Sequence, residues 1–243
     1  MDPGEYEAML ALDERHWWYR GRRAVLDAVL ARIELPPHAR ILDAGCGSGR
    51  TLDDLARRGA VHGIELNPLG VRAARLRRHE VQEAPVEAIP HEDASFDLVA
   101  CLDVLEHTED DAVALRELRR VTKPGGRLIV TVPAHPRLWS HHDELNGHRR
   151  RYTPRSLATA AGDCGWSLER RTGFNVVYLL PAALVRIARR SGTGDRAGKS
   201  ELRLTPPRLD PALELPLRAE AALIRRGHDL PPGLSLLAVL RKD

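Results

Sequence analysis

Alternate glycines follow an acidic residue at the end of the first short apolar run of the chain. The segment reads Ile41-Leu42-Asp43-Ala44-Gly45-Cys46-Gly47-Ser48-Gly49. Glycines at alternate positions let the backbone turn tightly and let a ligand approach main-chain N–H groups at a helix start. Glu65 ends the next apolar run, 22 residues after Asp43. In nucleotide-type α/β folds an acid at about that distance accepts hydrogen bonds from ribose hydroxyls, so these residues predict a site for a ribose-containing ligand.

The charge of Asp43 indicates what else this ligand carries. The dinucleotide pattern is G-x-G-x-x-G, whereas this chain has Asp43-x-Gly45-x-Gly47-x-Gly49. An acid before the first glycine would repel a pyrophosphate, but it suits an ammonium group. S-adenosylmethionine (SAM) carries an ammonium and a ribose and has no phosphate, so the spacing favours SAM over NAD.

Histidines are concentrated in a second candidate segment, which follows the fifth apolar run. Four of the 11 histidines fall between positions 135 and 148. His142 or His148 could act as a general base with Asp143 as its orienting carboxylate, because an imidazole with a pKa of about 6.5 accepts protons at neutral pH. The same three residues could instead ligate a metal ion or belong to a structural loop. We favour the base or substrate contact and expect no metal.

Aromatic residues are scarce, at 4% of the chain, yet they gather in two places. Trp17, Trp18 and Tyr19 are consecutive, and Trp139 and Tyr152 flank the histidines. Such clustering predicts a pocket wall, with Trp17, Trp18, Trp139 and Tyr152 in contact with a substrate. Trp17 and Trp18 could equally anchor an N-terminal helix in the core, although three consecutive aromatics cannot all face one side of a helix.

Short apolar runs alternate with amphipathic stretches along most of the chain, which is typical of a parallel sheet with crossover helices. Helices are expected at 5–33, 49–58, 68–78, 110–122 and 154–163, the last with Thr153 as N-cap. Residues 123–126, Lys-Pro-Gly-Gly, should form a turn. Strands are expected at 39–43, 60–64, 79–83, 96–102, 127–132, 166–178 and 234–241. This order predicts a Rossmann-like, doubly wound α/β fold with a seven-stranded, mostly parallel sheet.

Four regions follow from this pattern: an N-terminal helical lid at 1–35, the sheet core at 36–178, a helical insertion at 179–232 and the last strand at 233–243. Seven of the 17 prolines lie in the insertion, and residues 191–198 resemble a mobile linker. Residues 174–190 are apolar and basic. They could contact a membrane or a greasy substrate, but packing on the domain itself or on a second subunit of a homodimer is more usual.

The composition limits the function classes. Hydrophobic residues make up 43% and charged residues 29%, as in ordinary globular proteins. A net charge of +3 is too weak and scattered for a nucleic-acid footprint. Cys46, Cys101 and Cys164 form neither a disulfide framework nor a zinc motif. The N-terminus lacks a signal-peptide pattern, and no apolar run reaches the roughly 18 residues of a membrane span, so we expect a cytoplasmic protein.

Several ordered motifs give the chain a resemblance to a known family over residues 14–175. After the glycine loop come Gly63-Ile64-Glu65-Leu66-Asn67-Pro68, Ser95-Phe96-Asp97-Leu98-Val99, Leu102-Asp103-Val104-Leu105-Glu106-His107 and Leu118-Arg119-Arg120-Val121-Thr122-Lys123-Pro124-Gly125-Gly126. This sequence resembles the class I SAM-dependent methyltransferases, in particular the small-molecule type 11 and type 12 branch. The resemblance implies SAM as cofactor and S-adenosylhomocysteine as its product.

The resemblance also implies roles for single residues. Asp43 would meet the SAM ammonium, Glu65 the ribose hydroxyls, and Leu66 would pack on the adenine. Around the methionine part it implies Ala44, Gly45, Gly47, Leu102, Asp103 and His107, with Tyr19 and Arg22 closing over the carboxylate. Pro85 departs from the family, which often has an acid or a serine near the adenine amine. Proline offers no donor, so Val86 or Glu87 would read the adenine.

Together these patterns predict a methyltransferase that moves a methyl group from SAM to an oxygen or nitrogen of a small molecule, such as a specialised metabolite. Two alternatives remain within the same fold. One is a methyltransferase for a lipid or quinone at a membrane surface, and the other is a noncatalytic SAM-fold scaffold. An NAD-dependent oxidoreductase is disfavoured by the glycine spacing and by Asp43.

Overall fold

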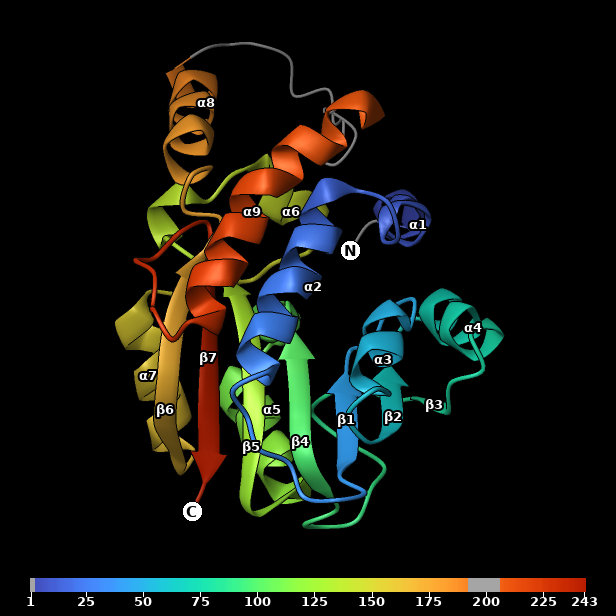
Figure 1. The fold of residues 1–243 in the computed structure, drawn as a ribbon. Coiled ribbons are helices and arrows are strands. Elements are labelled where there is room, and N and C mark those ends of the chain that lie inside the picture. The colour runs from blue at the N-terminus through green and yellow to red at the C-terminus, as the bar shows by residue number, and fades with distance from the viewer. Residues whose placement is uncertain (1–2, 192–205) are drawn as a thin grey trace.

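Seven strands of the described residues form one sheet with helices on both faces (Figure 1). The computed structural model describes residues 3–191 and 206–243. The sheet order is β3-β2-β1-β4-β5-β7-β6, and only β7 runs antiparallel to its neighbours. The strands are β1 (Arg40–Ala44), β2 (Ala60–Glu65), β3 (Val81–Glu83), β4 (Phe96–Leu102), β5 (Thr122–Pro133), β6 (Trp166–Phe174) and β7 (Ser235–Lys242). The predicted doubly wound, mostly parallel fold is confirmed.

The helices begin and end close to the predicted positions. They are α1 (Pro3–Leu12), α2 (Trp17–Leu30), α3 (Arg50–Leu55), α4 (Pro68–Leu76), α5 (Asp111–Val121), α6 (His141–Leu145), α7 (Pro154–Asp163), α8 (Leu179–Ser191) and α9 (Asp210–Arg225). The described residues also form short 3₁₀ helices, which are η1 (Leu105–His107), η2 (Pro136–Leu138) and η4 (Pro207–Leu209). The α7 start matches its signal, because the Thr153 side chain accepts a hydrogen bond from Ser156 N and Pro154 follows it.

Buried apolar stripes hold the helices against the two faces of the sheet. On one face, α5 buries Leu115, Leu118 and Val121 completely, at a three-residue spacing that places them on one side of the helix. On the other face lie α2 and α9 (Figure 1). Gly21 allows these two helices to approach closely, because a Cβ there would lie 2.2 Å from Leu217 Cδ1.

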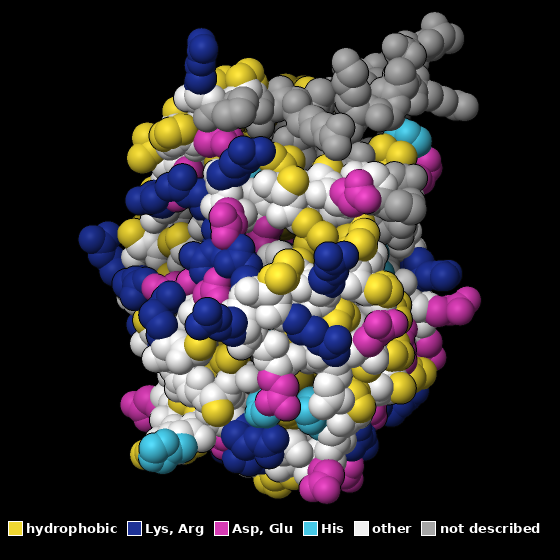
Figure 2. All heavy atoms as spheres, turned by 90° about the vertical axis from the view of Figure 1, so that its right-hand side faces the viewer, with side chains coloured by type: hydrophobic (Ala, Val, Ile, Leu, Met, Phe, Trp, Pro, Cys, Tyr) yellow, Lys and Arg dark blue, Asp and Glu magenta, His cyan; other side chains and the backbone are white. Residues whose placement is uncertain are grey.

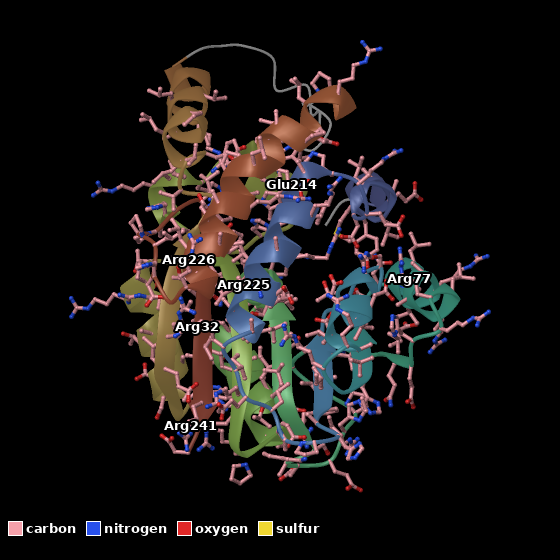
Figure 3. All side chains as sticks on the ribbon, in the orientation of Figure 1. Arg32, Arg77, Glu214, Arg225, Arg226 and Arg241 are labelled. Atoms are coloured by element: carbon pink, nitrogen blue, oxygen red, sulfur yellow. The ribbon has the colours of Figure 1, made fainter. Side chains whose placement is uncertain are left out.

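Ion pairs join α2 and α9 along their length, although the two helices are far apart in sequence. Arg225 Nη2 lies 2.5 Å from Asp27 Oδ2, and Arg20 Nη2 lies 2.9 Å from Glu214 Oε2. Figure 3 shows Arg225 and Glu214 on α9 beside α2. The N-terminal helix expected to act as a lid is thereby attached to the insertion between β6 and β7.

Two predictions of local structure differ from the observed fold, and a third is not tested by it. Residues 123–126 are part of β5, because the pairing shifts from Phe96–Thr122 to Leu98–Arg127 and the intervening residues bulge within the strand. The strand expected at 166–178 ends at Phe174, because the Glu220 carboxylate accepts hydrogen bonds from Asn175 N at 2.7 Å and Val176 N at 2.8 Å. The linker expected at 191–198 lies, apart from its first residue, outside the described residues.

The surface carries mixed charges. Figure 2 shows arginine and lysine side chains interspersed with aspartate and glutamate on the face that contains α3 and α4. The predicted absence of a nucleic-acid partner agrees with this mixture but stays a prediction. Within the described ranges, no helix combines the length and the apolar character needed to cross a bilayer.

Candidate functional site

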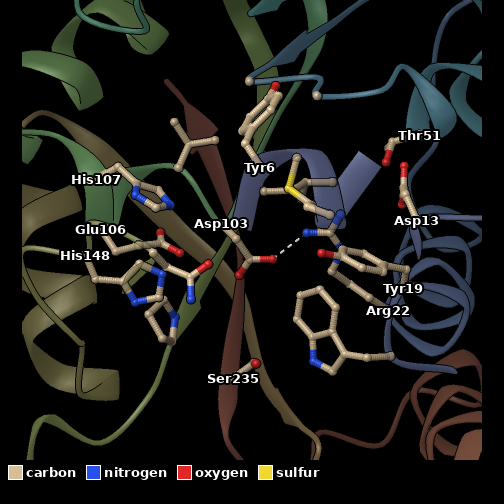
Figure 4. A pocket seen from close by; sticks show the side chains of 18 of the residues that line it. Tyr6, Asp13, Tyr19, Arg22, Thr51, Asp103, Glu106, His107, His148 and Ser235 are labelled. Carbon is tan, nitrogen blue, oxygen red and sulfur yellow. Dashed lines mark hydrogen bonds and ion pairs between the residues drawn. The ribbon is translucent and has the colours of Figure 1, made fainter. Parts of the chain in front are cut away.

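A cavity of about 810 Å³ opens at the carboxyl ends of β1, β2, β4 and β5. Ligands of open α/β sheets bind at this edge. Residues that follow these strands form its floor, while α1, α2 and α8 contribute its walls. Figure 4 shows side chains from these separate elements converging on the same space. The cavity is large enough for a cofactor and a small acceptor together.

The glycine loop after β1 has the backbone conformation that its composition predicts. Gly45, Gly47 and Gly49 all have positive φ angles, of 87°, 53° and 78°, where residues with a Cβ are strained. A Cβ on Gly45 would also lie 2.4 Å from Val104 Cγ2. Gly45 N and Cys46 N both donate to the carbonyl of Ile64, which ties the loop to the end of β2.

Glu65 braces the glycine loop and also faces the cavity. Its Oε2 accepts a hydrogen bond from Gly47 N at 2.9 Å, and its Oε1 accepts one from Asn67 N at 2.8 Å. A carboxylate can accept about four hydrogen bonds, so each oxygen keeps capacity for a ligand hydroxyl. Tyr6 of α1 lies close to Glu65, and both side chains contact Gly70. A Cβ on Gly70 would lie 2.1 Å from Tyr6 Oη and 2.8 Å from Glu65 Cγ.

Asp43 is an acidic group that the described residues leave incompletely paired. It is 1% exposed, and its Oδ2 has no hydrogen-bond partner among the described residues. Burial raises the pKa of Asp43 to about 7, although Arg22 opposes this shift. A buried carboxyl group of this kind gains from a cationic ligand, which would restore its ionised form.

Arg22 and Asp103 meet in the middle of the cavity (Figure 4). Arg22 Nη1 lies 2.5 Å from Asp103 Oδ2. The guanidinium also lies 5.1 Å from the ring centroid of Trp18 and 5.7 Å from that of Tyr19, within cation–π range. Asp103 has a φ of 57°, and a left-handed non-glycine residue at the end of a strand is a strained conformation found often at functional sites.

A histidine held by a buried carboxylate lines the opposite side of the cavity. His148 Nδ1 lies 2.9 Å from Asp143 Oδ1. Arg151 donates to both oxygens of Asp143, at 2.7 Å and 3.0 Å, and Ser140 N donates to Oδ2 at 2.8 Å. Burial alone would raise the pKa of Asp143, but the bonds from His148 and Arg151 prevail and hold it well below its usual range. The carboxylate is therefore ionised and orients the imidazole.

Glu106 and His107 complete this side of the cavity. Glu106 is 1% exposed, and burial together with Asp103 raises its pKa well above the usual range, which favours the protonated form. Burial and the nearby His148 lower the pKa of His107 to about 4. Potential ligand atoms of Glu106, His107 and His148 lie within 4.8 Å of one another, so these three residues could hold a metal ion. The alternative set of His142, Asp143 and His148 is less suitable, because Arg151 occupies the Asp143 carboxylate.

Comparison with known proteins agrees with this geometry. A family model described as a methyltransferase domain matches residues 42–130, which include the glycine loop, Glu65 and Asp103. This match agrees with the predicted resemblance to the class I SAM-dependent methyltransferases. A ubiquinone biosynthesis O-methyltransferase from Xanthomonas axonopodis pv. citri is 37% identical over 143 residues, which cover 52% of this chain and 59% of that protein. The chain thus spans a little over half the length of this curated relative.

Solved structures extend the likeness in fold to almost the whole chain. One is a methyltransferase from Haloferax volcanii in complex with the Trm112 activator, with a TM-score of 0.62, 20% identity and coverage of 98% of this chain and 97% of that one. Another is a SAM-dependent methyltransferase from Mesorhizobium loti, with a TM-score of 0.60, 19% identity and coverage of 90% and 98%. At these identities the similarity concerns the fold alone.

The residues that line the cavity suit SAM, the cofactor that the family resemblance implies. The unpartnered oxygen of buried Asp43 matches an ammonium group, and Gly45 and Gly47 of the glycine loop line the same cavity. Leu66 lines the cavity although it is 64% exposed, so an adenine could cover its apolar surface. Pro85, Val86 and Glu87 lie along the same part of the cavity, where the adenine was expected.

Most of the predicted site residues line the cavity, but four do not. Those that line it are Trp17, Trp18, Tyr19, Arg22, Asp43, Gly45, Gly47, Glu65, Leu66, Val86, Glu87, Leu102, Asp103, His107, His142 and His148. Ala44 is fully buried in the core, and Asp143 lies behind His148. Tyr152 is buried, and its hydroxyl donates to Asp111 Oδ2 at 2.7 Å. Trp139 is not among the lining residues either, so the expected substrate contacts of these two aromatics are not supported.

Sequence reasoning missed several residues that line or support the cavity. Glu106 lies in a motif on which the family resemblance rests, but the sequence does not show that its side chain is buried in the folded protein. Arg151 gave no local signal for its pairing with Asp143. Tyr6 and Met9 of α1, and Tyr178, Pro181, Ala182 and Arg186 at α8, also line the cavity. Only packing between distant segments brings these helices to the site.

Proposed function

We propose that this protein is a SAM-dependent O-methyltransferase that methylates a hydroxyl group of a small molecule, with His148 as the general base. One observation carries the proposal. A cavity that contains the SAM-type loop and Glu65 also contains an imidazole oriented by a buried carboxylate at 2.9 Å. Hydroxyl acceptors need a base for methyl transfer, because a neutral hydroxyl is a weak nucleophile. The name of the Xanthomonas relative also denotes an O-methyltransferase.

The residues around His148 suit proton transfer. SAM, when bound, supplies a methyl group that is already activated on a sulfonium. With Nδ1–H donating to Asp143, the neutral imidazole keeps the lone pair of Nε2 for the hydroxyl proton of the acceptor. The ionised Asp143 then stabilises the imidazolium, and Arg151 keeps Asp143 in place. His142 also lines the cavity but lies beside Asn146, with 3.1 Å between His142 Nδ1 and Asn146 Nδ2. It is the weaker candidate for the base.

The remaining walls favour a hydroxylated aromatic acceptor. Trp17 and Trp18 line the cavity, and the Trp17 ring lies 4.8 Å from the ring of Tyr178 between centroids. Aromatic walls of this kind bind flat, apolar molecules. In its protonated form, which burial favours, Glu106 can donate a hydrogen bond to an acceptor oxygen beside His148. Nitrogen acceptors, specialised metabolites and a cytoplasmic location stay predictions.

The experiment compares two histidines of the same segment. His148→Gln should lower kcat/KM for a phenolic acceptor by about 10²- to 10⁴-fold and leave SAM affinity within about threefold. His141→Gln is the matched control, because His141 is 49% exposed, pairs with Glu144 and does not line the cavity. Methyl transfer is followed by mass spectrometry over a panel of phenols, alcohols and amines, with and without a metal chelator.

Three outcomes would contradict the proposal. Turnover of His148→Gln at the wild-type rate would remove the base from the mechanism. A panel in which only amines are methylated would change the acceptor class. SAM binding without turnover on any acceptor would favour the noncatalytic scaffold.

A further inference from the structure

The outer face of α8 is apolar although it points away from the cavity. Leu180 and Leu184 lie four positions apart, so they share one face of the helix, and they are 67% and 59% exposed. Ala182 and Arg186 lie on the opposite face and line the cavity. Helices of globular proteins normally turn their apolar stripe towards the core. The exposed leucines of α8 therefore need another explanation.

More exposed apolar side chains lie at the same end of the molecule. Figure 1 shows α8 projecting beyond the carboxyl ends of the parallel strands, with α9 beginning at that end. The Tyr178 hydroxyl donates to the carbonyl of Leu213 and so connects the two helices. The six residues that we call the outer apolar surface are at least 48% exposed: Val177, Leu180, Leu184, Val185, Leu209 and Leu215.

Among the described residues next to this surface in sequence, a cation is exposed and the acidic groups are buried. Arg208, next to Leu209, is exposed. Asp210 and Glu214, in the first turns of α9, are both buried. Apolar side chains flanked by cations complement a bilayer that carries anionic lipids, because the leucines enter the acyl boundary while the cations meet the headgroups.

The length of α8 indicates how the helix would lie. Its 13 residues span about 20 Å at 1.5 Å per residue, which is shorter than the hydrocarbon core of a bilayer. Such a helix lies in the interface plane. In that orientation the cavity-lining face of α8 is directed away from the lipid, and the cavity opens beside the membrane surface.

We propose that the outer apolar surface docks this protein on a bilayer that contains anionic lipids. The docking surface itself does not depend on the chemistry of the site. On the membrane, an apolar acceptor would enter the cavity along α8. This role of the surface rests on the proposed function.

The test is co-sedimentation of the full chain with vesicles of phosphatidylcholine alone or mixed with phosphatidylglycerol. The double variant Leu180→Glu/Leu184→Glu should bind the mixed vesicles at least about tenfold more weakly than the wild type. Leu76→Glu is the matched control, because Leu76 is a 78% exposed leucine on α4. Wild type and control should bind the mixed vesicles equally well. Both should bind more weakly to vesicles of phosphatidylcholine alone, and more weakly to the mixed vesicles at high salt. Melting temperature and SAM affinity verify that each variant folds, and Leu184→Ser provides a milder second variant.

Several results would overturn the proposal. The proposal is wrong if the wild-type protein stays in the supernatant with mixed vesicles. It is also wrong if the double variant binds these vesicles as strongly as the wild type. A wild-type dimer that the double variant converts to a monomer, without vesicle binding, would assign the surface to a second copy of the chain. The two proposals fail separately. Vesicle binding without SAM binding contradicts only the proposed function, and turnover of soluble phenols without vesicle binding contradicts only the docking.

Discussion

Arg22 of α2 and Asp103, which follows β4, form an ion pair at 2.5 Å across 81 positions of the chain. The side chains are 15% and 19% exposed, so solvent screens the pair only partly. Trp18 and Tyr19 pack against the guanidinium. The pair connects the N-terminal helices to the sheet edge, at the place where the methionine part of SAM is expected. Arg22 keeps further donors for a ligand carboxylate, since a guanidinium has five.

Replacement of Arg22 should weaken SAM binding. Arg22→Met should raise the dissociation constant by about tenfold or more, because it removes a cation from a partly desolvated site and leaves Asp103 unpaired. Titration calorimetry measures this, with Arg57→Met, at a 61% exposed position, as the control. Arg22→Met/Asp103→Asn should recover thermal stability but not affinity. Unchanged affinity in Arg22→Met would mean that Arg22 only supports Asp103.

Glu65 should be required both for the cofactor and for the loop. Glu65→Ala removes the acceptor of Gly47 N and Asn67 N, and an unsatisfied buried donor costs about 1–3 kcal/mol. We expect at least about tenfold weaker binding of SAM and of S-adenosylhomocysteine, together with a lower melting temperature. NAD should bind neither protein. Glu80→Ala, at a 73% exposed side chain, is the control, and wild-type affinity in Glu65→Ala would refute the ribose contact.

SAM binding should release a proton from Asp43. In the free protein burial raises the pKa of this carboxyl group to about 7, so it is largely protonated at pH 6. The ammonium of SAM favours the carboxylate, so affinity should rise as the pH increases from about 5.5 to 7. Calorimetry at pH 6 in buffers of different ionisation enthalpy measures the released proton. Asp43→Asn should abolish the release, and equal release from this variant would assign the proton to another group.

His107 should make the folded protein less stable in mild acid. Its pKa in the folded protein is about 4, because burial and His148 disfavour the charged form, whereas an unfolded chain has a histidine pKa of about 6.5. Below pH 6.5 the unfolded state binds the proton first, so this contribution to stability is complete above pH 6.5 and is lost as the pH falls towards 4. The loss is at most roughly 3 kcal/mol.

Denaturant titrations at pH 7, 5.5 and 4.5 measure this effect. The difference in unfolding free energy between wild type and His107→Phe should change over that range, with the variant less sensitive to acid. Because the other histidines are common to both proteins, their contributions cancel in the comparison. Parallel pH profiles for the two proteins would show that His107 does not titrate as its burial implies.

The sequence by itself determined the order of strands and helices and the position of the SAM-type loop. These features depend on local spacing. Apolar runs of strand length, the N-cap Thr153 and glycines that adopt positive φ angles each act within a few residues. A parallel sheet then brings the ends of its strands to one edge, so Asp43, Glu65 and Asp103 had to lie close together once their strands were predicted correctly.

Only the tertiary structure decided which of the other candidates reach the site. Tyr152 points into the core and bonds to Asp111, while His148 and Glu106 face the cavity, although all three follow strand ends in similar stretches of sequence. The structure also brought α8 to the cavity and left its leucines exposed. These outcomes depend on packing between segments up to 200 residues apart, and on burial, which sets the ionisation of Asp43 and Glu106. Neither can be inferred from local residue spacing, because side-chain direction and desolvation arise only when the distant elements pack together.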